Sequence, residues 1–170
     1  MLSSNLPPAC STVIITSAGA DTITDFAVGA SGDQIDIDIS TVGAVIGGNA
    51  TDDTTGQAMS VEFVTGQEAL AAGDNIIVLS GTTFATAALA GSAIEAGGAR
   101  QVTFSANTTA NDDILFLYSD GTDSYLVAGN IATTTTTITA ANLTETTLLT
   151  LSGIDETELG SLNAANFDFI

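Results

Sequence analysis

The chain of 170 residues is 45% apolar and 5% aromatic, and it sets twenty Asp and Glu residues against a single basic one, Arg100. A net charge of −19 excludes a binding surface for nucleic acid or anionic lipid, and the absence of His and Lys excludes Ser-His-Asp and Cys-His catalysis, imidazole-bound metals, Schiff bases and P-loops. Because like charges oppose compaction, we expect external cations, Ca²⁺ above all, to neutralise the carboxylates; a merely solvated acidic surface is the alternative.

Length and composition predict one folded unit. We expect residues 1–17 to form a flexible N-terminal segment or a donor strand, and residues 18–170 to form a single β-rich domain. Met1–Ala9 lacks the basic region and apolar block of a secretory signal, and no run of residues predicts a membrane span. Cys10 is the only cysteine, so its possible roles are an intermolecular disulfide, a modification or an incidental thiol.

The first predicted elements are short strands. Thr12–Thr16 is a β-branched run, and Asp21–Phe26 alternates polar with apolar residues. Gln34–Ile39 has a strict period of two, which places its isoleucines on one face and Asp36 and Asp38 on the other. We expect the isoleucines to face the core.

A long acidic loop is predicted for residues 41–57, because this stretch is rich in Gly and Asp. The strands Met59–Thr65 and Asn75–Ser80 follow, and the second is apolar enough to lie inside a sheet.

One helix is predicted, over Thr83–Ala96, where the apolar residues change to a helical spacing. Thr82 or Thr83 is the expected N-cap, and Gly97-Gly98 ends the helix. The segment is short and Ala-rich, so we expect it to pack closely on a sheet.

A hairpin is the clearest feature of the C-terminal half. A strand at Gln101–Ala106 precedes it, and its two strands, Asp113–Ser119 and Ser124–Gly129, flank the turn Asp120-Gly121-Thr122-Asp123. For the Thr-rich tract Ala132–Ala141 the composition favours a strand over a linker.

The chain closes with a strand at Thr147–Ser152, an acidic turn or helical turn at Asp155–Leu162, and an alternating apolar end at Asn163–Ile170. These elements together predict a mainly β fold, a β-sandwich or a β-roll-like stack of short strands, with one short helix near residues 83–96.

Gly19–Phe26 followed by Gly32–Ile37 resembles the exit from the calcium-binding nonapeptide repeats of RTX proteins. The hairpin, Leu149–Gly153 and Ala165–Ile170 are similar to the tail of serralysin-type and other type I-secreted proteins, including bacterial surface-layer proteins. Thr16 and Ser17 stand where the repeat has glycines, so at most one degenerate calcium-binding turn is implied.

The resemblance implies Ca²⁺ ligands and an export route. Asp21 corresponds to the aspartate of the repeat, and Asp25, Asp33 and Asp36 lie in the segment that closes the last turn; solvent-facing carboxylates are the alternative. It also implies a type I exporter that reads residues 150–170, where the acidic and apolar end fits such a signal as well as a final edge strand.

Asp120 and Asp123 are further Ca²⁺ candidates, because they share one tight turn.

We therefore expect a secreted or cell-surface structural protein that self-assembles into a filament, lattice or matrix with Ca²⁺ support. Its strands lack the Lys and Pro that protect sheet edges, which favours a homo-oligomer formed by strand donation. The alternatives are a C-terminal secretion or adhesion module of a larger type I-secreted protein, and a carboxylate-dependent hydrolase or lyase. The chain offers no convergent set of catalytic residues, and we do not expect an enzyme.

Overall fold

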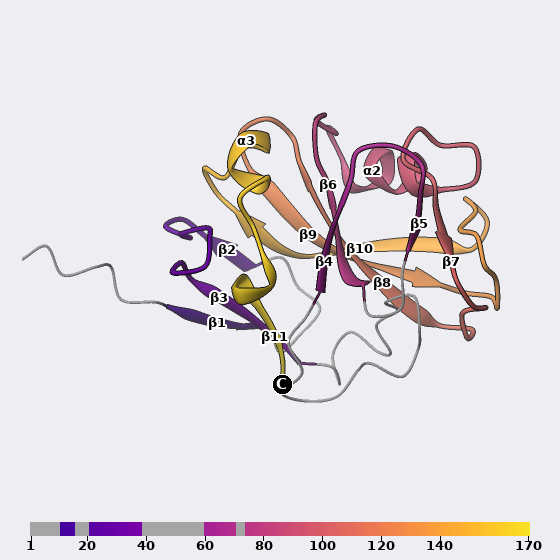
Figure 1. Ribbon diagram of the computed structural model, residues 1–170, viewed down its shortest axis with the longest axis horizontal. Coiled ribbons are helices and arrows are strands. Elements are labelled where there is room, and N and C mark those ends of the chain that lie inside the picture. The colour runs from indigo at the N-terminus through magenta and orange to yellow at the C-terminus, as the bar shows by residue number, and fades with distance from the viewer. Residues whose placement is uncertain (1–10, 16–20, 39–59, 71–73) are drawn as a thin grey trace, which may run out of the picture.

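The computed structural model describes residues 11–15, 21–38, 60–70 and 74–170 (Figure 1). This part of the chain is mainly β, as predicted, and forms three sheets. The predicted loop at residues 41–57 lies outside the described residues.

The N-terminal strands pass from one sheet to another and back. β1 (Thr12–Ile15) and β3 (Gln34–Ile37) are parallel neighbours in a three-stranded sheet, whereas β2 (Asp21–Ile23), between them in sequence, belongs to the six-stranded sheet. β11 (Phe167–Phe169) completes the smaller sheet on the other side of β3, also parallel to it. This alternation between sheets is a β-roll-like arrangement.

The six-stranded sheet has the order β2-β10-β9-β8-β6-β4. Its remaining members are β4 (Ser60–Val64), β6 (Asp74–Leu79), β8 (Asp112–Ser119), β9 (Ser124–Ile131) and β10 (Leu143–Leu151). The structure confirms the predicted hairpin, which β8 and β9 form. It also confirms that the strand now labelled β6 lies inside a sheet. β10 begins earlier than the predicted strand and carries a bulge between Thr147 and Leu149.

The third sheet pairs β5 (Glu68–Leu70) with β7 (Val102–Phe104) in parallel. It lies with α2 (Ala87–Ile94) over one face of the six-stranded sheet (Figure 1). The N-cap of α2 is Thr86, whose hydroxyl accepts from the Leu89 N–H, and not Thr82 or Thr83 as predicted. The helix is correspondingly shorter than expected.

Two short helical segments precede β11. α3 (Glu156–Leu159) lies where an acidic turn or helical turn was predicted, and it has a capping box between Asp155 and Glu158. The 3-10 turn η1 (Ala164–Asn166) then leads directly into β11. In the described residues, no helix is both long and apolar enough to cross a membrane.

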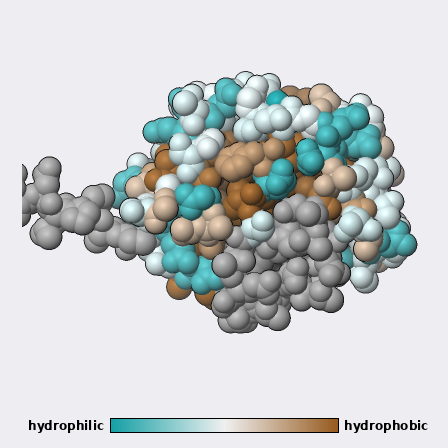
Figure 2. Space-filling model, in the orientation of Figure 1, coloured by the Kyte–Doolittle hydropathy of each residue, from teal (hydrophilic) through white to brown (hydrophobic). Residues whose placement is uncertain are grey.

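The six-stranded sheet is buried on both faces, so the core has two parts. Along β8, Leu115 and Leu117 face the three-stranded sheet. Ile114 and Phe116 point to the opposite face, toward α2 and the two-stranded sheet. Ile35 and Ile37 of β3 are fully buried in the first part, which confirms the predicted faces of this strand. Figure 2 shows apolar residues gathered between β4 and the segment from α3 to β11, where the first part of the core reaches the surface.

The Thr-rich tract is not a strand, contrary to the prediction. Apart from one bridge between Thr137 and Thr103, it is irregular and is held by side chains. Thr108 receives a hydrogen bond from the Thr135 N–H at 3.0 Å and donates to the Thr133 carbonyl at 3.3 Å. The tract lies along the outer edge of β7, where the Phe104 N–H donates to the Thr136 carbonyl. Hydroxyls that bond to the nearby backbone replace the regular ladder that β-propensity favours.

Candidate functional site: carboxylates of the three-stranded sheet and the acidic turns

The only basic side chain of the protein is turned inward. Arg100 is 8% exposed, and its Nη1 donates to the Val64 carbonyl at 3.0 Å. The carboxylates on the surface are therefore not interspersed with cationic side chains.

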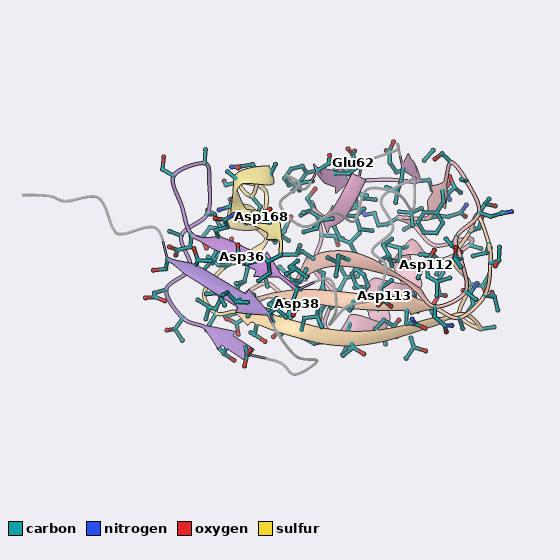
Figure 3. The ribbon with its side chains drawn as sticks, turned by 90° about the horizontal axis from the view of Figure 1, so that it is seen from below. Asp36, Asp38, Glu62, Asp112, Asp113 and Asp168 are labelled. Carbon is teal, nitrogen blue, oxygen red and sulfur yellow. The ribbon has the colours of Figure 1, made fainter. Side chains whose placement is uncertain are left out.

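Asp36 and Asp168 lie side by side on neighbouring strands (Figure 3). The parallel register pairs Asp36 of β3 with Asp168 of β11, on the face opposite the buried isoleucines. Asp36 is half-buried, and its Oδ1 is enclosed without a hydrogen-bond partner. Burial, and secondarily the charge of Asp168, raise the pKa of Asp36 above its ordinary value. In the same row, Ile14 of β1 stands opposite Asp36 with 51% of its surface exposed.

Asp33, a predicted Ca²⁺ ligand, accepts two hydrogen bonds from the backbone. Its carboxylate is 8% exposed and accepts from the Ser11 N–H at 2.7 Å and the Ala27 N–H at 2.8 Å. These bonds fasten the start of β1 to the turn before β3. Both oxygens of Asp33 therefore serve the fold.

Asn166 closes the same turn from the other end of the chain. The side chain is fully buried, and its Oδ1 accepts from the N–H groups of Gly29 and Asn163 at 3.1 and 3.2 Å. Its Nδ2 donates to the carbonyls of Gly29 and Asp33 at 3.1 and 2.8 Å. Sequence reasoning did not identify this residue.

The hairpin turn uses its two aspartates for internal hydrogen bonds. Asp120 accepts from the Thr122 and Asp123 N–H groups at 2.9 and 3.0 Å through Oδ1, and from the Tyr125 hydroxyl at 2.8 Å through Oδ2. The backbone N–H of Asp123, more than any other cause, lowers the pKa of Asp120. Asp123 accepts from the Gly153 N–H at 2.8 Å. The turn is acidic and ordered by its own contacts.

Asp21 and Asp25 are exposed at and after β2, and the structure does not bring them together with Asp36 as one cluster. Within the described ranges, no three acidic or cysteine side chains converge so that they could hold a metal ion. Ca²⁺ takes six to eight oxygen ligands. The pair of Asp36 and Asp168 has fewer oxygens than this number.

Two other acidic pairs lie on the six-stranded sheet and next to it. Asp113 is half-buried and accepts from Asn130 Nδ2 at 2.9 Å; burial and the neighbouring Asp112 raise its pKa, against the opposing effect of that hydrogen bond. Asp112 and Asp113 stand at the start of β8 (Figure 3). On the other side of the six-stranded sheet, burial and then Glu145 raise the pKa of Glu95.

Asp168 is the functional candidate that sequence reasoning placed only in a terminal signal. Its alternation with Phe167 and Phe169 predicts a strand, but nothing local indicates that this strand lies next to β3.

Comparisons with known proteins give no relative to set beside this geometry: no protein-family model, curated protein or solved structure matches the chain.

Proposed function

We propose that this protein is an extracellular structural protein that self-assembles into a filament, lattice or matrix, with Ca²⁺ bridging the acidic faces of neighbouring copies. The observation that carries the proposal is the burial of Arg100 on the Val64 carbonyl, in a chain with twenty acidic residues. Carboxylates without internal cations repel other copies until external cations bridge or screen them. Assembly would then respond to Ca²⁺.

The carboxylates support bridging between molecules better than a closed site within one molecule. Asp36 and Asp168 lie opposite each other on two neighbouring strands, and Asp21 and Asp25 are exposed at and after β2, on the edge of the six-stranded sheet. Each group supplies fewer oxygens than Ca²⁺ requires. A second copy can supply the others.

Analytical ultracentrifugation and electron microscopy of the purified chain test this proposal. We expect large regular assemblies with millimolar Ca²⁺, and their loss on adding a chelator. The matched control is NaCl at equal ionic strength, which screens charge without bridging. A chain that stays monomeric at high concentration with Ca²⁺ contradicts the structural role, and equal assembly in NaCl contradicts the role of Ca²⁺.

Export by a type I exporter that reads residues 150–170 belongs to the same proposal. Deleting Asn163–Ile170 would also remove β11 and the Asn166 contacts, so failed export of the deleted chain would be ambiguous. Fusing residues 150–170 to a small unrelated reporter avoids this difficulty. We expect exporter-dependent secretion of the fusion; retention of this reporter, with secretion of one carrying residues 1–30, would contradict the proposed route.

A C-terminal secretion or adhesion module of a larger protein is the second candidate. The passage of β1, β2 and β3 between two sheets supports it, because this is the coil geometry that the RTX resemblance implies. The intact mass of the protein in its native host separates the two. A mass near 17.0 kDa favours the independent structural protein, and a much larger mass favours the module.

A further inference from the structure

β1 is an edge strand that carries no charge. The acidic residues on the other open edges of the described sheets are Asp21 of β2, Glu62 of β4, Glu68 of β5 and Asp168 of β11. β7 is also uncharged, but the Thr-rich tract lies along its outer edge, where the Phe104 N–H donates to the Thr136 carbonyl. Among the described strands, β1 alone combines an open edge with no carboxylate.

The backbone of β1 has groups available on its outer side. The Ser11 and Ile15 carbonyls accept from the Gln34 and Asp38 N–H groups, so these alternate positions face β3. Successive residues of a strand point their backbone groups to opposite sides. The N–H and C=O of Thr12 and Ile14 therefore point away from β3. No strand in the described part of the chain pairs with them.

We infer that β1 pairs with β1 of a second copy, antiparallel about a twofold axis. The inference deepens the proposed function, on which it rests for its biological meaning, by naming one contact between copies. Two identical strands related by a twofold axis run antiparallel. With Val13 opposite Val13 of the partner copy, Thr12 and Ile14 of each strand pair across the axis through about four backbone hydrogen bonds.

Charge selects this partner over the other edges of the chain. Like charges directly opposite one another destabilise a strand pair. Pairing β2, β4 or β11 with its own copy sets carboxylates together, whereas β1 brings only Thr, Val and Ile into contact. The contact also covers Ile14, which is 51% exposed in the single chain.

The pairing is short, so its affinity is limited, and the charge of −19 on each copy opposes it. We therefore expect the dimer at high protein concentration and at salt concentrations that screen charge. Cation bridging between acidic faces would then join such dimers into larger assemblies.

Sedimentation velocity over a concentration series in high NaCl, then with Ca²⁺, tests the inference with the full chain. Ile14→Pro removes the outward N–H and leaves the ladder to β3 intact, so we expect dimer association to weaken by about tenfold or more. Ile14→Ala keeps the N–H and shortens the side chain, so a smaller loss is expected. Leu89→Ala is the matched control, because Leu89 is 55% exposed on α2, away from β1, and this change should have no effect.

Hydrogen exchange gives a second measurement that does not depend on a variant. In the dimer the Thr12 and Ile14 amides should become protected as concentration rises. Circular dichroism establishes that each variant is folded before its association is compared.

The outcomes separate the inference from the proposed function. If folded Ile14→Pro associates as the wild type does, β1 is not the contact, although Ca²⁺-driven assembly can stand. If the wild type forms an Ile14-dependent dimer that never grows with Ca²⁺, the contact stands and the structural function falls. A wild type that is monomeric under every condition overturns both.

Discussion

Asp36 faces Asp168 across two neighbouring strands, and one of its oxygens is enclosed without a hydrogen bond. A carboxyl group whose pKa is raised in the folded state stabilises the fold only while it is protonated. This contribution is complete below the unfolded value, near 3.8, and is lost as the pH rises through the folded pKa. At neutral pH the pair therefore destabilises the native protein.

Asp36→Asn should raise the free energy of unfolding at neutral pH by up to about 1 kcal/mol, a figure limited by solvent screening. In urea denaturation the gain should vanish below the unfolded pKa of 3.8, where Asp36 is protonated in both states. Asp25→Asn is the control, because it removes one exposed charge elsewhere. An equal gain in both variants would attribute the effect to net charge and not to the pair.

Tyr125 offers a spectroscopic test of the hairpin turn. Its hydroxyl donates to Asp120, and this bond is the main cause that raises the pKa of Tyr125 to about 12. Asp120→Asn should lower that pKa toward 10.0, measured by ultraviolet titration of the phenolate. Burial, and secondarily the charge of Asp120, raise the pKa of Tyr118, so the pKa of this stacked neighbour should fall less in the variant. An unchanged Tyr125 titration would contradict the contact.

At the scale of elements, Asn166 joins η1 to the turn before β3. Asn166→Ala removes the partner of the buried Asp33 carbonyl and of the part-buried backbone groups of Gly29, and we expect a loss of about 2–4 kcal/mol in unfolding free energy. Asn163→Ala, which removes only the cap of η1, should cost about 0.5–1 kcal/mol. Equal losses in urea denaturation would show that Asn166 acts only as part of the turn.

The helix α2 packs on β10 at Gly91, where an added Cβ would collide with the Glu145 carboxylate. Alanine is a better helix former than glycine by about 0.8–1 kcal/mol, but in the wild type this gain is offset by displacing Glu145. In a Glu145→Ala background, Gly91→Ala should therefore stabilise by about 0.5–1 kcal/mol. A double-mutant cycle by thermal unfolding measures the coupling, and strict additivity would contradict the close packing.

Elements specified by local pattern could be predicted from the sequence, and those specified by distant contacts could not. The β8–β9 hairpin follows from its Asp-Gly turn, and the faces of β3 follow from its period of two. β5 is only three residues long, and it is a strand because it pairs with β7. The Thr-rich tract has β-propensity, but its hydroxyls bond to the backbone instead.

The candidate site was likewise predictable in part. The aspartates could be located on turns and strand faces, but which carboxylates meet depends on sheet order. The pairing of Asp36 with Asp168 and the capture of Asp33 by backbone N–H groups both join segments distant in the sequence. No periodicity encodes such pairings.

For the whole molecule, the excess of negative charge predicts a stability that depends on salt. Because self-repulsion opposes compaction, moderate NaCl should raise the midpoint of thermal unfolding by a few degrees at neutral pH. Near the isoelectric point, about 4.1, the same salt should have little effect. A midpoint independent of salt at neutral pH would indicate that the surface carboxylates are already neutralised.

The place of β3 between β1 and β11 determines when this chain can fold. β3 lies near the beginning of the sequence, yet one neighbour is formed by residues 167–169, and Asn166 reaches the Asp33 carbonyl across 133 positions. β2 likewise pairs with β10, a strand much later in the sequence. Pairings that close such long loops form slowly. β2 and β3 therefore leave the ribosome before β10 and β11, with which they pair in the folded protein, have been synthesised.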